Sequence, residues 1–190
     1  MAHDFVTLVS GLPRSGTSMM MRMLEAGGLP VLVDHVRTAD EDNPEGYYEF
    51  ERVKKIEQDT AWLDDAHGKV VKMISALLTH LPPGHTYKVV FMRRKLDEVL
   101  ASQRQMLIRR GKPTDATSDE RMAQFFTRHL EKVDAWMQAQ PNLEVLYVSY
   151  NELMEDPQTH CARVAGFLGL PMDPARMAAV ASTRLYRQRR

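Results

Sequence analysis

The stretch Phe5-Val-Thr-Leu-Val-Ser-Gly-Leu-Pro-Arg-Ser-Gly-Thr-Ser-Met-Met20 decides the fold of this chain. Its first residues, 5–9, form an apolar and β-branched run, which predicts a short buried strand. The chain then turns between Gly11 and Gly16 and continues as a helix from Thr17. A strand, a glycine-bounded loop and a helix in this order can cradle an anion, because loop N–H groups and the positive helix end converge on one point.

The loop is close to the P-loop pattern, in which two glycines four residues apart are followed by Lys and then by Ser or Thr. Gly11 and Gly16 have this spacing, but Thr17 stands at the lysine position and a cation, Arg14, lies inside the loop. A nucleoside triphosphate needs that lysine together with Mg²⁺. An anion with less terminal charge needs less positive charge around it. Arg14, backbone amides and the helix end then suffice to bind it without a metal. A phosphosulfate is such an anion.

The composition is that of an ordinary globular protein of 190 residues, 44% hydrophobic and 26% charged, which predicts one domain over 1–190. Lys+Arg and Asp+Glu balance at 25 each, which argues against a nucleic-acid-binding protein. No apolar run is as long as a membrane span, and the N-terminus lacks the pattern of a signal peptide. Cys161 is the single cysteine, which indicates a reducing compartment. We therefore expect a cytoplasmic protein that binds neither membranes nor nucleic acids.

Beyond the loop, the apolar pattern predicts strands that alternate with helices. We expect further strands over 31–33, 69–74, 87–92 and 143–148. We expect helices over 17–26, 50–63, 97–110, 118–140, 157–168 and 174–181. Thr117 and Glu120 form a candidate capping box for the fourth helix, Asp156 is an expected N-cap for the fifth, and 36–49 is turn-rich. This alternation is typical of an α/β fold with a mostly parallel central sheet flanked by helices.

Two segments carry a resemblance to a known family. The first comprises Pro13, Arg14, Ser15, Gly16, Thr17 and Ser18. It resembles the 5′-phosphosulfate-binding loop, Pro-(Lys/Arg)-Ser-Gly-Thr-(Thr/Ser), of the sulfotransferases that use 3′-phosphoadenosine 5′-phosphosulfate (PAPS). The second, Val89–Asp97 followed by Ser102, resembles their 3′-phosphate motif, in which a strand-end Arg precedes a helix Ser by eight residues. Arg94 and Ser102 have that spacing, and Arg93 is an alternative one residue earlier. Separate binding motifs for a 5′-phosphosulfate and a 3′-phosphate suit PAPS and do not suit ATP.

The C-terminal part of the chain also resembles this family. Tyr147 to Pro171 is similar to its Tyr-x-x-Leu, Asp-Pro and Phe-Leu-Gly run, which supports a P-loop-NTPase-like sulfotransferase fold. The basic tail over 184–190 matches the family's segment that closes over the nucleotide. The resemblance then implies Tyr186 beside the adenine and Arg187 at the 3′-phosphate. A solvated charged tail is the other interpretation of this segment.

The resemblance implies in-line transfer of a sulfuryl group from PAPS to a hydroxyl or amine of a small molecule, sugar or peptide. Such a reaction needs positive charge at the leaving phosphate oxygen and a general base at the acceptor. Arg14 and Lys72 are the candidates for the charge, Lys72 because it matches the Lys of the family's Lys-x-His strand motif. Ile74 occupies the His position, so the histidine base of the small-molecule branch is missing.

Glu49 is the expected base, because 43–49 resembles the Asn-Pro-x-Gly-Tyr-(Phe/Tyr)-Glu segment of bacterial, carbohydrate-type members, which use a carboxylate. Asp34 and His35 compete with it, since both follow a predicted strand, where α/β active sites open. Glu49 has an alternative role as a charge that stabilises a helix N-terminus. The other histidines are scattered, no His/Cys cluster has metal-site spacing, and we expect no metal.

Two other functions stay open on the sequence. Asp34 at a strand end is compatible with a kinase-like phosphotransferase that uses ATP and Mg²⁺. A catalytically inactive nucleotide-binding module would keep the fold and both phosphate-binding motifs but would not transfer a group.

Overall fold

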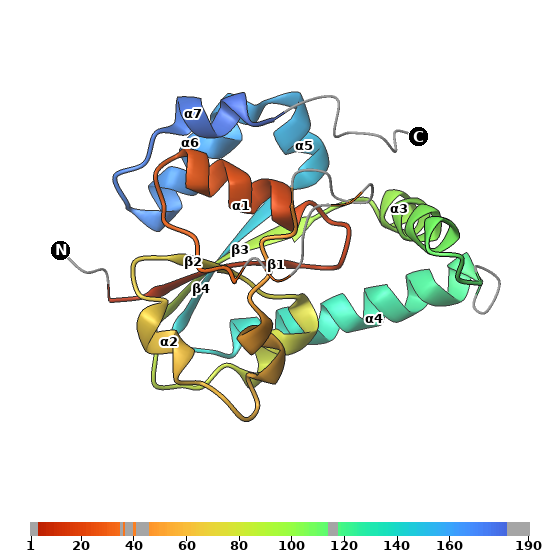
Figure 1. Ribbon diagram of the computed structural model, residues 1–190, viewed down its shortest axis with the longest axis horizontal. Helices are drawn as coiled ribbons and strands as arrows, with labels where there is room; N and C mark the ends of the chain where they lie inside the picture. The colour runs from red at the N-terminus through yellow and green to blue at the C-terminus, as the bar shows by residue number, and fades with distance from the viewer. Residues whose placement is uncertain (1–3, 35, 37–39, 41–45, 114–117, 182–190) are drawn as a thin grey trace.

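The computed structural model describes residues 4–34, 36, 40, 46–113 and 118–181. Its centre is a sheet of four parallel strands in the order β2-β1-β3-β4. The strands are β1 (Val6–Gly11), β2 (Val70–Lys72), β3 (Tyr87–Arg93) and β4 (Leu143–Ser149). The expected parallel sheet flanked by helices is therefore confirmed, and its strands all end at the same edge (Figure 1).

Side chains that alternate along the strands divide the core between the two faces of the sheet. Val9 and Val90 pack against one helical layer, and Leu8 and Phe91 pack against the other. The first layer consists of α1 (Thr17–Ala26), α5 (Tyr150–Glu155), α6 (Pro157–Leu168) and α7 (Pro174–Ala179) (Figure 1). The second consists of the 3₁₀ helices η1 (Glu51–Lys55) and η2 (Ser75–His80), α2 (Trp62–Asp65) and part of α4 (Asp119–Gln138).

The helix α3 (Leu96–Arg109) follows β3 and forms a hairpin with α4 that projects from the carboxyl edge of the sheet (Figure 1). A small core of Val99, Leu100 and Phe126 joins the two helices to Leu12 of the glycine-bounded loop. The hairpin thereby forms one wall of the edge at which the strands end. No helix among the described residues is long and apolar enough to cross a membrane.

The predicted strand over 31–33 is wrong, because only Val31 forms an isolated parallel bridge, to Val70. Leu32 N–H donates to the Val70 carbonyl at 2.9 Å, and the chain then leaves the sheet. It leaves because the Asp34 carboxylate accepts the backbone N–H of Glu51, which draws the segment toward η1. Side-chain acceptors of this kind offer the backbone an alternative to a strand ladder.

The predicted helix over 50–63 is also wrong, since the chain forms η1 and the four-residue α2 with a turn between them. The Asp59 side chain causes the break: it accepts from the Arg52 guanidinium at 2.7 Å and from Ala61 N–H at 3.3 Å. The apolar residues of the segment are still buried, among them Ile56 and Trp62. The hydrophobic pattern indicated the right face but the wrong secondary structure.

The helix ends follow the expected capping chemistry with one exception. Asp156 is the N-cap of α6 and accepts from Thr159 N–H at 3.1 Å, as predicted. The cap of α4 is Ser118, whose Oγ accepts from Arg121 N–H at 3.3 Å. The predicted capping box was one residue early, and its Thr117 lies outside the described residues.

We expect Leu24→Ala to lower the free energy of unfolding by about 2–5 kcal/mol, because it removes a fully buried side chain of α1 and leaves a cavity against the sheet. Urea denaturation followed by circular dichroism measures the change. The control is Ile108→Ala on α3, whose side chain is 54% exposed and whose loss should cost less than about 0.5 kcal/mol. Equal losses in the two variants would contradict the assignment of α1 to the core.

Candidate functional site

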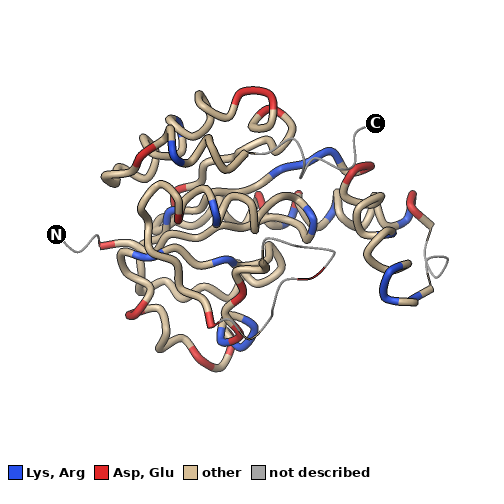
Figure 2. The backbone as a smooth tube through the Cα atoms, turned by 45° about the horizontal axis from the view of Figure 1, so that its top comes forward, with Lys and Arg blue, Asp and Glu red and all other residues tan. Residues whose placement is uncertain are grey.

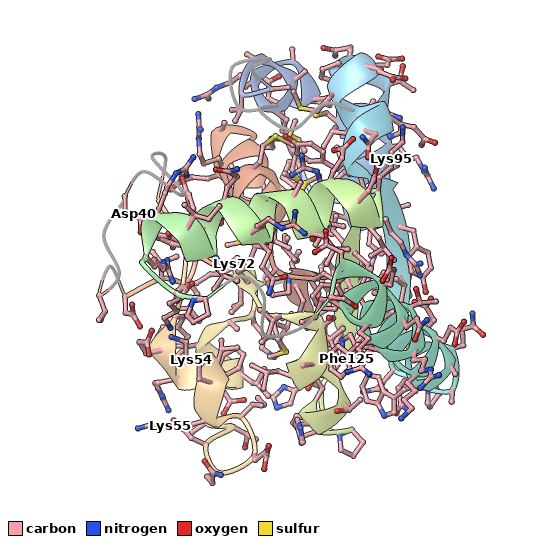
Figure 3. The ribbon with its side chains drawn as sticks, turned by 90° about the vertical axis from the view of Figure 1, so that its right-hand side faces the viewer. Asp40, Lys54, Lys55, Lys72, Lys95 and Phe125 are labelled. Atoms are coloured by element: carbon pink, nitrogen blue, oxygen red, sulfur yellow. The ribbon has the colours of Figure 1, made fainter. Side chains whose placement is uncertain are left out.

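The fold brings the predicted site residues together at the carboxyl edge of the sheet, because parallel strands all end there. Those that the structure describes are Pro13, Arg14, Ser15, Gly16, Thr17, Ser18, Glu49, Lys72, Arg94 and Ser102. Figure 3 looks onto this edge, with Lys72 near the centre between Asp40 on one side and Phe125 of α4 on the other. His35, Tyr186 and Arg187 lie outside the described residues.

The loop between β1 and α1 is closed by its own serine. Ser15 is buried, and its Oγ donates to the Leu12 carbonyl at 2.7 Å while its N–H donates to the same oxygen at 3.2 Å. Arg14 has a left-handed φ of 72°, a conformation that costs energy in any residue other than glycine. Such strain is often found where a loop is shaped for binding.

At Gly16 the loop packs directly against the Tyr150 side chain, which the sequence did not single out. A Cβ atom at Gly16 would lie 2.4 Å from the Tyr150 ring, and the residue has a φ of 99°. Any larger residue would therefore both strain the backbone and push the loop off Tyr150. The glycine of the motif is required by this close approach as well as by the turn.

The N-terminus of α1 is left open to a ligand. Among the described helices, α4, α5, α6 and α7 each have a side-chain N-cap, whereas α1, α2 and α3 have none. Gly16 is the N-cap of α1, and no side chain of the described residues caps it. The first N–H groups of a ten-residue helix and its positive dipole end thus face the loop, which is the arrangement that binds anions.

The two motifs that were separate in the sequence meet in the structure. Arg14 Nε donates to Ser102 Oγ at 2.9 Å, and Arg94 Nη1 donates to the Arg14 carbonyl at 3.2 Å. Arg93 turns the other way: it pairs with Asp134 of α4, and its guanidinium lies 4.8 Å from the Tyr147 ring centre. The geometry therefore places Arg94, and not Arg93, at the loop.

Arg94 is held by groups that sequence analysis missed. Its Nε donates to Glu98 Oε2 at 2.8 Å, and its guanidinium lies 4.5 Å from the Tyr150 ring centre. The other oxygen of Glu98 accepts from Asn151 Nδ2 at 2.7 Å. The one signal in the sequence is the spacing of Arg94 and Glu98, four residues apart at the start of a helix. Asn151 and Tyr150 follow β4 and gave no signal.

A hollow of about 260 Å³ opens beside this group. It is lined by Arg93, Arg94, Lys95, Ser149, Asn151, Glu152 and Glu155. Figure 2 shows a run of basic positions, in blue, where β3 passes into α3. These positions are Arg93, Arg94 and Lys95, which line the hollow. Glu152 and Glu155 of α5 line the other side, so the hollow has one basic and one acidic wall.

Lys72, at the end of β2, lies against the first turn of α1. Its Nζ donates to Ser18 Oγ at 3.2 Å and to the Tyr47 carbonyl. Glu49 Oε1 lies 4.0 Å from the same Nζ, and the other Glu49 oxygen lies 3.4 Å from Lys54 Nζ. The two proposed catalytic side chains, Lys72 and Glu49, are thus side by side beside the open helix end, and only 9% and 18% exposed.

Asp34, the competing base, is engaged by the backbone. Its Oδ1 accepts from Val36 N–H at 3.1 Å, and its Oδ2 accepts from Glu51 N–H at the start of η1. Asp34 therefore accepts the N–H at the start of η1. It takes the place at a helix N-terminus that was the alternative role of Glu49. This leaves Glu49 as the carboxylate that lies next to Lys72.

A serine–histidine contact lies just beyond the position where the resemblance expects a histidine. Ile74 holds that position and is 45% exposed. The next residue, Ser75, is buried, and its Oγ lies 2.8 Å from His129 Nε2 of α4. Burial, together with the nearby Lys132 ammonium, lowers the pKa of His129 below its ordinary value. The shift favours the neutral form of His129, at a place that the sequence pattern did not connect with the site.

The carboxyl edge thus brings cationic side chains and a carboxylate to an open helix end. Arg14, Lys72 and Arg94 lie around the loop, and Glu49 lies beside Lys72. This arrangement can bind an anion at two points and hold a proton acceptor next to one of them. Those are the requirements for transferring an anionic group to a nucleophile.

Comparison with solved structures places the fold among sulfotransferases. The sulfotransferase domain of the Synechococcus PCC 7002 olefin synthase is 16% identical with a TM-score of 0.58, over 99% of this chain and 84% of that one. Sulfotransferase STF1 of Mycobacterium tuberculosis is 18% identical with a TM-score of 0.56, over 93% and 71%. Mouse sulfotransferase SULT7A1 complexed with PAP is 14% identical with a TM-score of 0.52, over 95% of this chain but 63% of that one.

No curated protein sequence matches the chain significantly. The family model of the sulfotransferase domain, however, matches residues 6–189, which is nearly the whole length. The match includes the loop, the Arg94–Ser102 segment and the Lys72 strand, whose side chains the structure brings to one edge. The chain therefore belongs to the sulfotransferase domain family.

Proposed function

We propose that this sulfotransferase binds PAPS across the carboxyl edge of the sheet and transfers its sulfuryl group to a hydroxyl or amine acceptor. The observation that carries the proposal is the contact of Arg14 with both Ser102 and Arg94, because it joins the two phosphate motifs into one site. The open end of α1 and Arg14 would hold the 5′-phosphosulfate. Arg94 and Ser102 would hold the 3′-phosphate, and we extend the same proposal to Tyr186 and Arg187 on the resemblance alone.

The proposed reaction is an in-line displacement. The acceptor loses a proton to the Glu49 carboxylate, its oxygen or nitrogen forms a bond to sulfur, and the bond between sulfur and the bridging phosphate oxygen breaks. The charge that develops on this oxygen is stabilised by Lys72 and Arg14. Lys72 is suited to this because it lies against the first turn of α1 and 4.0 Å from Glu49.

We propose that the reaction requires no metal, since the cations at the edge are side chains and Asp34 is engaged by the backbone rather than placed to hold Mg²⁺. The single cysteine, Cys161, is buried, and burial raises its pKa to about 11. A chain that cannot form an internal disulfide fits a reducing compartment, so we propose a cytoplasmic location. The acceptor is proposed to be a small molecule, sugar or peptide, as in the carboxylate-base branch.

The function is tested with the product adenosine 3′,5′-bisphosphate (PAP). We expect PAP to raise the melting temperature equally in Mg²⁺ and in EDTA, because binding to the folded chain stabilises it. ATP should have little effect under either condition. Stabilisation by ATP that depends on Mg²⁺, without any by PAP, would instead identify a kinase-like phosphotransferase.

Removal of the Arg94 charge should weaken the binding of PAP roughly 10–100-fold, as expected when a charge-assisted hydrogen bond to a phosphate is lost. The variant is Arg94→Gln with Glu98→Gln, which avoids leaving a buried carboxylate uncompensated. Isothermal titration calorimetry measures the dissociation constant. The matched control is Arg93→Gln, whose guanidinium faces Asp134 and Tyr147 and which should bind PAP like the parent. If Arg93→Gln weakens PAP binding and the Arg94 variant does not, then Arg93 binds the 3′-phosphate instead of Arg94.

Glu49→Gln should slow transfer by roughly 10²–10⁴-fold, the usual contribution of a general base, while leaving PAP affinity within about threefold. Release of PAP from PAPS, with water as the acceptor, provides the rate. Lys72→Ala should also slow this release, because the leaving oxygen loses a cation. The control is Glu51→Gln, since Glu51 shares the Lys54 contact of Glu49 but is more exposed. If Glu49→Gln keeps the parental rate, Glu49 is not the base.

A further inference from the structure

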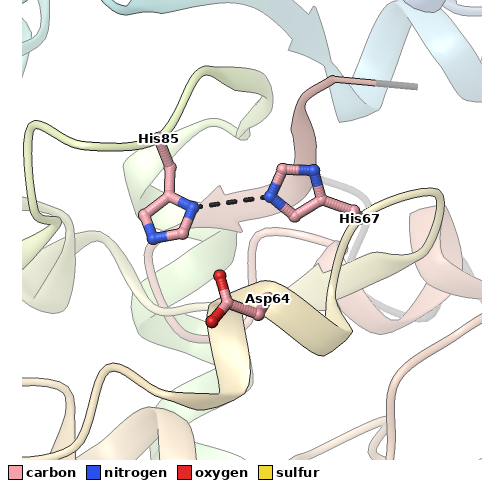
Figure 4. Close-up of side chains that lie close together, drawn as sticks. All are labelled: Asp64, His67 and His85. Carbon is pink, nitrogen blue, oxygen red and sulfur yellow. Dashed lines mark hydrogen bonds between the residues drawn. The ribbon is translucent and has the colours of Figure 1, made fainter. Parts of the chain in front are cut away.

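A second cluster of chemically reactive side chains lies at the opposite edge of the sheet. It consists of Asp64, His67 and His85. Asp64 belongs to α2, His67 forms an isolated bridge with Val6 at the start of β1, and His85 precedes β3 by two residues. The cluster (Figure 4) is therefore at the amino ends of β1 and β3, whereas the anion site is at the carboxyl ends of the strands.

The distance between the two histidine nitrogens of the cluster is that of a metal site. The three potential ligand atoms all lie within 4.8 Å of one another, and His67 Nε2 lies 3.4 Å from His85 Nδ1. Two nitrogens bound to one tetrahedral Zn²⁺ at 2.0–2.1 Å are separated by about 3.3–3.4 Å. Figure 4 shows the Asp64 carboxylate directed toward the space between the two rings. The two nitrogens thus already have the spacing of two corners of a zinc tetrahedron.

The backbone holds both histidines in place without any ion. The His85 carbonyl accepts from Asn142 Nδ2 at 2.7 Å, and the next carbonyl, that of Thr86, accepts from Val6 N–H at 2.9 Å. His67 is bridged to the same Val6. Both rings are only partly exposed, and the His85 ring lies 6.2 Å from the buried Tyr87 ring. The backbone that carries the two histidines is therefore tied to the sheet.

We propose that Asp64, His67 and His85 bind a Zn²⁺ ion through one carboxylate oxygen, Nε2 and Nδ1 respectively. Two imidazoles and a carboxylate suit zinc, whereas Mg²⁺ and Ca²⁺ prefer all-oxygen sites. No fourth His, Cys, Asp or Glu of the described residues joins the cluster, so water completes the tetrahedron. The ion joins α2 to the amino ends of β1 and β3, which stabilises the fold and takes no part in sulfuryl transfer.

The competing explanation is a hydrogen bond between the two rings with a carboxylate nearby. The two explanations differ in what Zn²⁺ does to the full-length, metal-free protein. We expect one Zn²⁺ per chain in calorimetry, and a melting temperature that rises with Zn²⁺ until the site is full. Co²⁺ should bind with the strong visible absorption of a tetrahedral ion.

Asp64→Asn and His85→Asn should each weaken Zn²⁺ binding tenfold or more. Asp64 is exposed, so its replacement leaves the core intact even if His85→Asn fails to fold. His80→Asn is the matched control, because His80 is a half-exposed histidine that pairs with Glu57 outside the cluster. No binding at one ion per chain, or binding that survives both Asp64→Asn and His85→Asn, would overturn the site. The PAP-induced rise in melting temperature should persist in every variant, which separates this result from that of the proposed function.

Discussion

The buried ion pair between Arg94 and Glu98 is the interaction on which the rest of the anion site depends. The two side chains are only 8% and 1% exposed and meet at 2.8 Å. Neither can turn away without leaving a buried charge uncompensated, a change that costs about 3–5 kcal/mol in comparable pairs. The guanidinium is therefore held with Nη1 at the Arg14 carbonyl, and this contact ties the loop to the residue that follows β3. Asn151 completes the arrangement by holding the second oxygen of Glu98.

The part of the site that the sequence predicted is the part built by local chemistry. The loop from Gly11 to Ser18 needs its glycines for backbone geometry, so its pattern is visible in a single chain. The meeting of Arg94 and Ser102 with that loop followed from the resemblance to the family and from the rule that parallel strands end together. The alternation of apolar runs likewise predicted a parallel sheet with helices on both faces, since burial on two sides leaves a strong pattern.

The errors occurred where contacts distant in sequence decide local structure. Nothing near Val31 announces that Asp34 will bind the N–H of Glu51 and end the strand at one bridge. The Tyr150 ring beneath Gly16 was equally invisible, because the two residues meet only after β4 has joined the sheet. The cluster of Asp64, His67 and His85 gave no signal in the sequence for the same reason, because the fold brings together side chains that no short motif contains.

The contacts that unite the loop with the second motif span 80 and 88 residues of the chain. Such distant contacts form late, because closing a long segment of chain costs entropy before any contact is gained. The ring that supports Gly16 comes later still, from the residue directly after β4. During synthesis, the nascent chain thus completes its strand-loop-helix unit early but acquires a nucleotide-binding site only after Tyr150 has left the ribosome. Capture of the nucleotide would then report that all four strands have assembled.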